Sequence, residues 1–458
     1  MKNYIGKIHV KWCKNCNVPL LGKKCGICGE DSVEVKLTPP GDARIAFKYD
    51  IDFINLIIER DYSKRALSYK KIILINKIPG DEESYEIIED GVVKYLISYD
   101  IDKGWRVKLK PYGALKLKDS KKYIKVDKKV AEILKNRKIS ILRPGILEFG
   151  EFEKGDDVLI FDEDNNLLGV GLAQISSDEA IKLNKGKIVK VRGILDREVE
   201  GKEYESLEEA LNKMVEANKE VLNRYEINSI GFIKNTYKKI NKKVIVPFSG
   251  GKDSLTALIL TLKAISRENI EVIFIDTGLE FPETLENIKE VEEKYNIKIK
   301  VLKPNKSFWE LLDKYGIPGR DYRWCSEALK LEPLKEYIKD EVLAFVGLRK
   351  YESYNRAKKK LIERNTYIKK QINAYPIFHW SSLHVWIFLL KEKAPYNKLY
   401  EKGFDRIGCY LCPAMGLGEI ERVKELYNNL WERFERELRK YFNEEEIKKG
   451  LWRWKNPQ

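Results

Sequence analysis

The spacing of hydrophobic positions changes at about residue 241, and the change separates two parts of the chain. Beyond this point short apolar runs predict strands at residues 244–246, 272–275, 297–302 and 342–346. An apolar stretch over 255–265 predicts a helix soon after the first strand. Strands that alternate with helices favour an α/β fold with a doubly wound parallel sheet. We expect the ligand site of this sheet beyond the C-terminal ends of its strands.

Before residue 241 the patterns indicate several smaller regions. Turn residues dominate the start, mixed helical and strand patterns follow, and short strands interrupted by glycine come next. Apolar residues at helical spacing then predict a connector helix. The second region contains no chemical motif that we recognise. The predicted regions are 1–36, 37–118, 119–196, 197–240 and 241–458.

The charge of the chain favours a polyanionic partner. Its 458 residues include 86 Lys and Arg against 71 Asp and Glu, which gives a formal net charge of +15. Basic side chains bind phosphates and release counterions, so RNA is one expectation and a charged thermophile surface is the other. No apolar run reaches the roughly 18 residues of a membrane helix, and no signal-peptide core is present. We therefore expect a cytoplasmic protein that spans no membrane.

A loop of small and charged residues directly follows the first predicted strand of the sheet. Its glycines let the backbone approach an anion, and the amides that begin the next helix point at that anion. Lys252 adds positive charge, and Asp253 is a candidate ligand for Mg²⁺. The spacing differs from that of a Walker A motif, but the composition predicts a pyrophosphate site. The loop residues are Ser249, Gly250, Gly251, Lys252, Asp253 and Ser254.

Four segments together resemble the phosphoadenosine phosphosulfate (PAPS) reductase family, which belongs to the PP-loop ATP pyrophosphatase-like superfamily. The first is the loop, and the second is the strand end that begins Asp-Thr-Gly at Asp276. The third is Cys-Ser-Glu-Ala-Leu-Lys-Leu-Glu-Pro-Leu at 325–334, and the fourth is Gly-Leu-Arg-Lys-Tyr-Glu-Ser-Tyr-Asn-Arg at 347–356. The resemblance extends over residues 241–415 and implies a bound adenine nucleotide.

The resemblance also implies roles for single residues. Asp276, Thr277 and Gly278 are expected near the adenosine of ATP. Gly347, Arg349 and Arg356 are expected at the anion pocket, where guanidinium groups suit phosphate oxygens. Surface ion pairing is the alternative role for the two arginines. We expect catalysis to depend on Lys252, Asp253, Cys325 and Arg349.

Three cysteines lie in the C-terminal region, at Cys325, Cys409 and Cys412, the last two in a Cys-x-x-Cys-Pro element. Three thiolates can bind a 4Fe-4S cluster and leave one iron open. Zinc, or structural or redox thiols, are the alternatives. In the adenylyl-sulfate reductases of the family a cysteine pair precedes Glu-Pro-Leu, whereas here Ser326 replaces the second cysteine. The set resembles the cluster site of PP-loop tRNA thiolation enzymes, which implies that the open iron carries a sulfide.

A second departure from the reductases concerns their nucleophile. The reductases resemble one another in a cysteine near the C-terminus, in a Glu-Cys-Gly type of motif. After Cys412 this sequence contains no cysteine. We therefore expect that it does not reduce PAPS.

Four cysteines near the N-terminus form two Cys-x-x-Cys knuckles eight residues apart. Each knuckle places two thiolates on a tight turn, and two such turns can close a tetrahedral site for Zn²⁺. Four thiolates leave no open position, so the predicted role of the metal is structural. A rubredoxin-like iron is the alternative. The predicted ligands are Cys13, Cys16, Cys25 and Cys28.

Residues 122–196 resemble the PUA domain, a small β-barrel of RNA-modifying enzymes. The matching runs are Ile-Ser-Ile-Leu-Arg-Pro-Gly-Ile at 139–146, Lys-Gly-Asp-Asp-Val at 154–158 and the glycine-rich strands that follow. Short strands with glycine corners also suit any other small barrel. The resemblance implies contact with structured RNA through its shape and phosphates, for which Arg143 and Lys154 are candidates.

The combined regions predict an ATP-dependent enzyme that modifies RNA, most simply a tRNA sulfurtransferase. The predicted cofactors are ATP, Mg²⁺, Zn²⁺ and a 4Fe-4S cluster, and the predicted partners are tRNA and a sulfide or persulfide donor. A sulfonucleotide reductase is one alternative, and a non-catalytic RNA-binding protein with a nucleotide switch is another. ATP-driven amide or ester formation on RNA is a third. The sequence indicates neither the base nor the oligomeric state.

Overall fold

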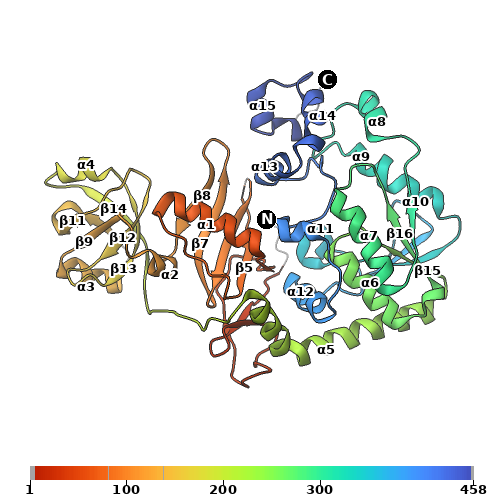
Figure 1. The fold of residues 1–458 in the computed structure, drawn as a ribbon, viewed down its shortest axis with the longest axis horizontal. Coiled ribbons are helices and arrows are strands. Elements are labelled where there is room, and N and C mark those ends of the chain that lie inside the picture. The colour runs from red at the N-terminus through yellow and green to blue at the C-terminus, as the bar shows by residue number, and fades with distance from the viewer. Residues whose placement is uncertain (1–5, 81, 138, 455–458) are drawn as a thin grey trace. The chain divides into compact units, whose positions relative to one another are not determined.

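The computed structural model describes residues 6–80, 82–137 and 139–454, and Figure 1 traces them as a ribbon. The ends of the predicted regions 1–36 and 241–458, at residues 1–5 and 455–458, lie outside the described residues. The chain divides into two compact units, His9–Ala217 and a second unit that runs from Asn218 and also includes residues 6–8. Across the described ranges, no helix is both long enough and apolar enough to span a membrane.

The N-terminal unit begins with a small antiparallel sheet that holds the two cysteine knuckles. Its strands are β1 (Lys11–Cys13), β2 (Val18–Leu20) and β3 (Val33–Glu34), in the order β2-β1-β3. Trp12 is fully buried, and its indole N–H donates to the side chain of Asn17 at 2.8 Å. The first knuckle therefore lies in the β1–β2 turn, and the second knuckle precedes β3.

A five-stranded antiparallel sheet and one helix follow, in the region without a motif. Helix α1 (Lys48–Tyr62) buries Ile51, Ile54 and Ile58 at helical spacing against this sheet. It ends where Ser63 adopts a left-handed conformation. The strand order is β4-β5-β6-β7-β8. The strands are β4 (Arg44–Ile45), β5 (Ile73–Lys77), β6 (Ser84–Glu89), β7 (Val92–Asp100) and β8 (Gly104–Leu109).

The third part of this unit is a six-stranded sheet in the order β10-β14-β13-β12-β9-β11. Its neighbours are antiparallel except β9 and β12, which run parallel. Leu159, Phe161 and Val170 pack into the same core as the five-stranded sheet, so the two sheets share one hydrophobic cluster. The elements are α2 (Pro111–Ala114), β9 (Tyr123–Val126), α3 (Lys128–Asn136), β10 (Ser140–Leu142), β11 (Ile146–Phe149), β12 (Asp157–Phe161), β13 (Leu167–Ala173), α4 (Ser177–Ile181) and β14 (Lys187–Ile194).

The predicted connector helix is α5 (Leu207–Ile240), and its later turns belong to the C-terminal unit. There the Glu226 carboxylate pairs with the ammonium groups of Lys263 and Lys391, each at 2.6 Å. The Ser229 hydroxyl donates to the Pro376 carbonyl at 2.8 Å. These contacts fix the second half of α5 to the other helices of its unit.

A six-stranded sheet forms the centre of the C-terminal unit, in the order β17-β16-β15-β18-β20-β19. Every neighbouring pair is parallel except β19 and β20. The parallel, doubly wound sheet predicted from the sequence is therefore confirmed. The order reverses beside β15, the first strand in sequence. The strands are β15 (Lys243–Pro247), β16 (Ile270–Ile275), β17 (Ile299–Leu302), β18 (Val342–Phe345), β19 (Ile362–Arg364) and β20 (Gln371–Ala374).

Helices connect these strands and continue beyond the sheet (Figure 1). Helix α6 contacts β15 and β18, and it buries Leu255, Leu258 and Ile259. Pro282 opens α7, which ends at Asn296 in a left-handed conformation. The helices are α6 (Lys252–Ala264), α7 (Pro282–Tyr295), α8 (Phe308–Tyr315), α9 (Trp324–Ser326), α10 (Glu332–Tyr337), α11 (Tyr354–Ala357), α12 (Ser382–Lys391), α13 (Leu417–Leu426), α14 (Asn428–Leu438) and α15 (Glu444–Lys448).

Candidate functional site

The loops that follow β15 and β18 meet at the point where the strand order reverses. A side chain added at Gly347 would place its Cβ 2.2 Å from the carbonyl oxygen of Asp253, so only glycine allows this approach. Gly250 adopts a φ of 72°, which glycine tolerates and other residues rarely adopt. The predicted anion loop and the predicted arginine loop thus form one site at the C-terminal edge of the sheet.

The close approach at Gly347 gives a testable prediction. The Gly347→Ala substitution is expected to destabilise the protein by about 1–3 kcal/mol and to weaken nucleotide binding, because the backbone of the two loops must separate. Gly231→Ala in helix α5 is the matched control, since no atom lies within 4 Å of the position that a Cβ at Gly231 would take. The control is expected to gain about 0.5–1 kcal/mol. Thermal unfolding and ATP titration measure both effects, and equal behaviour of the two variants would contradict the prediction.

The charged residues of the two loops form a trio, in which Lys252 and Arg349 are buried and Asp253 is half-buried. The Asp253 carboxylate accepts hydrogen bonds from Arg349 Nε at 2.6 Å and from Lys252 Nζ at 3.1 Å. Burial favours the neutral acid, but the charges of Arg349 and Lys252 outweigh burial and lower the pKa of Asp253 to about 2. Burial lowers the pKa of Lys252, and the neighbouring Asp253 charge more than compensates, so its pKa rises. The trio is therefore ionised and carries a net charge of +1.

Other contacts hold the loop at the start of α6. The hydroxyls of Ser249 and Ser254 lie 3.1 Å apart, and Ser254 also donates to the Gly251 carbonyl at 2.9 Å. The Lys252 N–H donates to the Tyr400 hydroxyl at 2.9 Å, and the Lys252 ammonium lies 5.5 Å from the centre of the Tyr400 ring. Tyr400 thus fixes the first turn of the helix. Nothing in the sequence pattern singles out Tyr400, because it lies 148 residues away from Lys252.

A cavity of about 140 Å³ lies beside the loop, at the C-terminal ends of β15 and β16. Apolar side chains such as Phe248 and Leu334 line it, together with Ser249 and the charged residues Glu280 and Lys330. A mixed lining of this kind suits a nucleoside, which has an apolar base face and a polar edge.

The strand end at Asp276 begins the loop next to this cavity. Asp276 accepts from the Gly278 N–H at 3.0 Å and pairs with exposed Lys303 at 3.4 Å. The Thr277 hydroxyl donates to Glu280 at 2.8 Å and lies 3.8 Å from the Cys409 sulfur. Asp276 and its neighbours therefore adjoin both the cavity and the cysteine loop.

Lys330 joins the cavity to the C-terminal cysteines. Lys330 lines the cavity and interacts with the sulfur of Cys409, a thiol whose pKa burial raises. The Cys409 charge raises the pKa of Lys330, although burial opposes this shift. Lys330 lies in a π-helical turn, Glu327–Leu331, directly after Cys325. Lys330 lies inside the segment 325–334 that carries part of the family resemblance, but the sequence analysis assigned it no role.

The three predicted cluster cysteines lie near one another. Burial, followed by the charges of Cys409 and Cys412, raises the pKa of Cys325 to about 11. Cys409 is held to the strand end after β16 by an isolated backbone bridge to Glu280. The Tyr410 N–H donates to the Leu279 carbonyl at 3.0 Å.

Two arginines brace the loop that carries Cys409 and Cys412. Arg320 donates to the Pro413 carbonyl at 3.1 Å and to the Met415 carbonyl at 2.9 Å. Buried Arg453 donates to the same Met415 carbonyl at 2.8 Å. The C-terminal segment therefore helps to place these cysteines, a role that the sequence pattern does not indicate.

The cysteine spacing tests which metal group the residues fit. A single tetrahedral zinc ion with bonds of about 2.3 Å requires thiolates about 3.8 Å apart. In the part of the chain that the structure describes, one group of three or more metal-binding side chains gathers within 4.8 Å, and it is the N-terminal set. Cys325, Cys409 and Cys412 do not belong to that group. The cluster itself stays a prediction.

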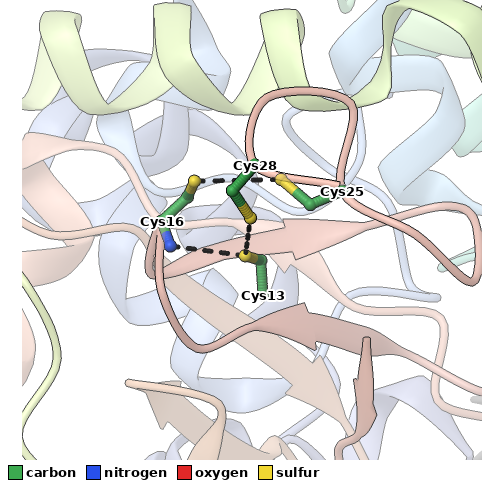
Figure 2. Close-up of side chains that lie close together, drawn as sticks. All are labelled: Cys13, Cys16, Cys25 and Cys28. Carbon is green, nitrogen blue, oxygen red and sulfur yellow. Dashed lines mark hydrogen bonds between the residues drawn. The ribbon is translucent and has the colours of Figure 1, made fainter. Parts of the chain in front are cut away.

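The N-terminal thiols fit a single ion. Figure 2 shows the two knuckles facing each other, with Cys13 opposite Cys28 and Cys16 opposite Cys25. The sulfur atoms of these pairs lie 3.5 Å and 3.8 Å apart. Cys13 and Cys25 are buried. This set can bind a metal such as zinc.

Three further predicted residues lie in other surroundings. Arg356 pairs with Glu352 on its own loop, and no contact places it in the trio. Arg143 stacks on Phe149 at 4.9 Å and donates to the Ile146 carbonyl, so it already contributes to local structure. Lys154 is exposed. The roles of these three residues stay predictions.

Parallel strands with a predicted anion loop at their switch point define a doubly wound α/β fold, in which ligands bind at that point of the sheet. The sequence profile of the phosphoadenosine phosphosulfate reductase domain matches residues 243–415, and that of the PUA domain matches residues 122–195. The chain belongs to the phosphoadenosine phosphosulfate reductase family, which supports an enzymatic function in this superfamily.

Several known proteins are similar to this chain. The uncharacterized protein MJ0066 of Methanocaldococcus jannaschii is 60% identical over 100% of this chain and 98% of its own length. Adenosine 5'-phosphosulfate reductase 2 of Bacillus subtilis is 31% identical over 41% of this chain and 79% of its own length. A solved PAPS reductase from Candida auris covers 37% of this chain and 82% of its own, with 23% identity and a TM-score of 0.32.

Proposed function

We propose that the protein is an ATP-dependent RNA-modifying enzyme, and that its reaction is the transfer of sulfur to a base of tRNA. The observation that carries the proposal is the position of Lys330. Lys330 lines the cavity beside the anion loop and lies close enough to Cys409 for the two side chains to interact electrostatically. In this proposal the nucleotide site and the sulfur site therefore lie next to each other, with Lys330 between them.

The anion loop binds the pyrophosphate end of ATP, and the cavity beside it accepts the adenosine. Lys252 and Arg349, held by Asp253, stabilise the negative charge that develops on the phosphates. A carbonyl oxygen of the RNA base attacks the α-phosphorus. The bond from phosphorus to the bridging oxygen breaks, and pyrophosphate leaves with that electron pair. Mg²⁺ would share this charge through oxygen ligands, for which Asp253 is the candidate.

The second step replaces the activated oxygen. Hydrosulfide adds to the base carbon that carries the adenylate, the carbon–oxygen bond breaks, and AMP leaves with the electron pair. The hydrosulfide proton passes to solvent, and a carbon–sulfur double bond remains. Cys325, Cys409 and Cys412 would hold a 4Fe-4S cluster, whose open iron binds sulfide when the cluster is present. Lys330 places a positive charge between that site and the cavity, where it favours an anionic sulfur species.

The PUA match supplies the argument for RNA as the second substrate. Its residues 122–195 carry the resemblance, and the formal net charge of +15 favours a polyanion. Without this domain the same site would suit a small sulfonucleotide equally well.

The test is a product assay. Anaerobically purified protein is incubated with tRNA, ATP, Mg²⁺ and sulfide, and the digested RNA is analysed by mass spectrometry. We expect a thionucleoside and one pyrophosphate released for each sulfur inserted. Cys325→Ser is expected to lower the product at least about 10²-fold. Ser326→Ala is the matched control, and it should retain activity because a neighbouring hydroxyl is not a ligand. Iron-containing protein that binds tRNA but makes no thionucleoside would refute the proposal.

Reduction of adenylyl sulfate is the second candidate function. The adenosine 5'-phosphosulfate reductases among the similar proteins favour it, at 28–31% identity over 39–43% of this chain. The absence of a cysteine after Cys412 in the sequence disfavours it. Sulfite release from adenylyl sulfate with a dithiol reductant and without RNA would establish this activity in place of thiolation.

A further inference from the structure

A polar cleft of about 220 Å³ lies in the N-terminal unit, far in sequence from the anion loop. One wall comes from the β7–β8 hairpin and the end of α1, and the other comes from the PUA-like sheet at Asp156 and Asp157. Figure 1 shows these elements in neighbouring parts of the unit. Because the two sheets share one hydrophobic cluster, the walls of the cleft are held together by packing.

The acidic side chains of the cleft already have partners. The Asp157 carboxylate, 5% exposed, accepts from the Leu109 N–H at 2.8 Å. Asp156 pairs with Lys122 at 3.1 Å and accepts from the Glu153 N–H at 3.0 Å. Asp61 accepts from Arg60 through both of its oxygens. Asp100 accepts two backbone N–H groups of its own turn.

Unlike most of these acids, three basic side chains of the same cleft form no ion pair among the described residues. Lys103, Arg106 and Lys108 line it, and within the described ranges none of their side-chain nitrogens has a carboxylate partner within 4.0 Å. Val107 and Leu109 alternate with them along β8 and point into the core, so Arg106 and Lys108 share the outward face. Residues two apart on a strand lie about 7 Å apart, a spacing similar to that of successive phosphates. The charges of Asp61, Asp156 and Asp157 are balanced by Arg60, Lys122 and Arg192, so only Asp100 opposes the three basic side chains and the cleft keeps an excess of positive charge.

We propose that this cleft binds the phosphate backbone of an RNA, with Lys103, Arg106 and Lys108 on consecutive phosphates. The half-buried Arg106 guanidinium can form a fork to two oxygens of one phosphate, and the two lysines act as point charges beside it. The cleft adds the β7–β8 hairpin to the RNA surface, which the PUA resemblance alone does not include. In naming RNA as the ligand, the inference rests on the proposed function.

The experiment compares two triple variants of the full-length protein. In the first, Lys103→Gln, Arg106→Gln and Lys108→Gln remove the cleft charges. In the control, Lys36→Gln, Lys70→Gln and Lys116→Gln remove the same charge from the same unit, at side chains that lie outside the cleft. Binding of end-labelled bulk tRNA is measured by anisotropy over a series of potassium chloride concentrations. Thermal unfolding and metal content show that both variants are folded.

The cleft variant is expected to bind tRNA more weakly, on the order of tenfold or more, while the control stays close to the wild type. The slope of log K against log salt should fall in magnitude by roughly 2, since each lost phosphate contact contributes about 0.7–0.9. Inorganic phosphate and ATP serve as competitors, to distinguish an RNA backbone from a small phosphate ligand.

Equal affinities and equal slopes for the two triple variants would overturn the inference. Absence of tRNA binding by the wild type would overturn it too, as would displacement of tRNA from the cleft by millimolar phosphate in low-salt buffer. The proposed sulfur transfer fails differently, because tRNA then binds with the predicted slope and no thionucleoside forms. Hydrogen exchange adds a local readout, with slower exchange expected in β7 and β8 when tRNA is bound.

Discussion

Asp253→Asn is expected to abolish turnover and to destabilise the C-terminal unit by about 3 kcal/mol, near the lower end of the range for breaking a buried ion pair. The carboxylate separates two cations, Lys252 and Arg349, and asparagine cannot neutralise either of them. We place the cost near the lower end because the Asp253 side chain is 16% exposed, so water screens part of the remaining repulsion. Such a loss corresponds to a fall in Tm of about 6–12 °C for a unit of this size.

Asp276→Asn is the matched control for stability. Asp276 pairs with Lys303, whose side chain is 72% exposed, so loss of the pair should cost at most about 1 kcal/mol. Thermal unfolding measures both variants, and pyrophosphate release with tRNA measures the turnover of Asp253→Asn. The prediction would be contradicted if the Asp253→Asn variant had the Tm of the wild type and still released pyrophosphate. The trio of Lys252, Asp253 and Arg349 would then contribute neither to stability nor to turnover.

The anion loop was predictable because its information is local. A strand, two glycines and a helix start lie within twelve residues, and each has a known conformational preference. The contact between Asp253 and Arg349 spans 96 residues and exists because the strand order reverses beside β15. Spacing along the chain carries no sign of that contact, and only the family resemblance placed Arg349 near the pocket.

Other parts of the molecule were less predictable. Residues 37–118 showed only mixed patterns, although Asp90 and Gly91, with φ of 57° and 73°, form a tight turn between β6 and β7. An Asp-Gly pair between apolar runs is a hairpin signal that could have indicated the sheet. The family resemblance includes Lys330 in the segment 325–334 but gives it no role, and the basic residues of the cleft have the sequence pattern of ordinary solvated side chains. Their roles arise from what packs beside them.

Removal of the metal from the N-terminal knuckles is expected to have the largest effect on this chain, since a structural zinc site can contribute about 10–16 kcal/mol. Burial raises the pKa of Cys13 to about 11, so without a metal this thiol stays protonated and no metal bond joins the two knuckles. In the second knuckle, the Gly26 N–H donates a hydrogen bond to the Ala217 carbonyl of α5 at 2.9 Å. We therefore expect the Cys13→Ser variant to lose one zinc per chain. Residues 11–34 and 207–217 should then exchange their amide hydrogens faster, whereas the exchange rates of β15–β18 should stay unchanged. Cys325→Ser, the control, should keep its zinc, and unaltered exchange in zinc-free Cys13→Ser would contradict a structural role.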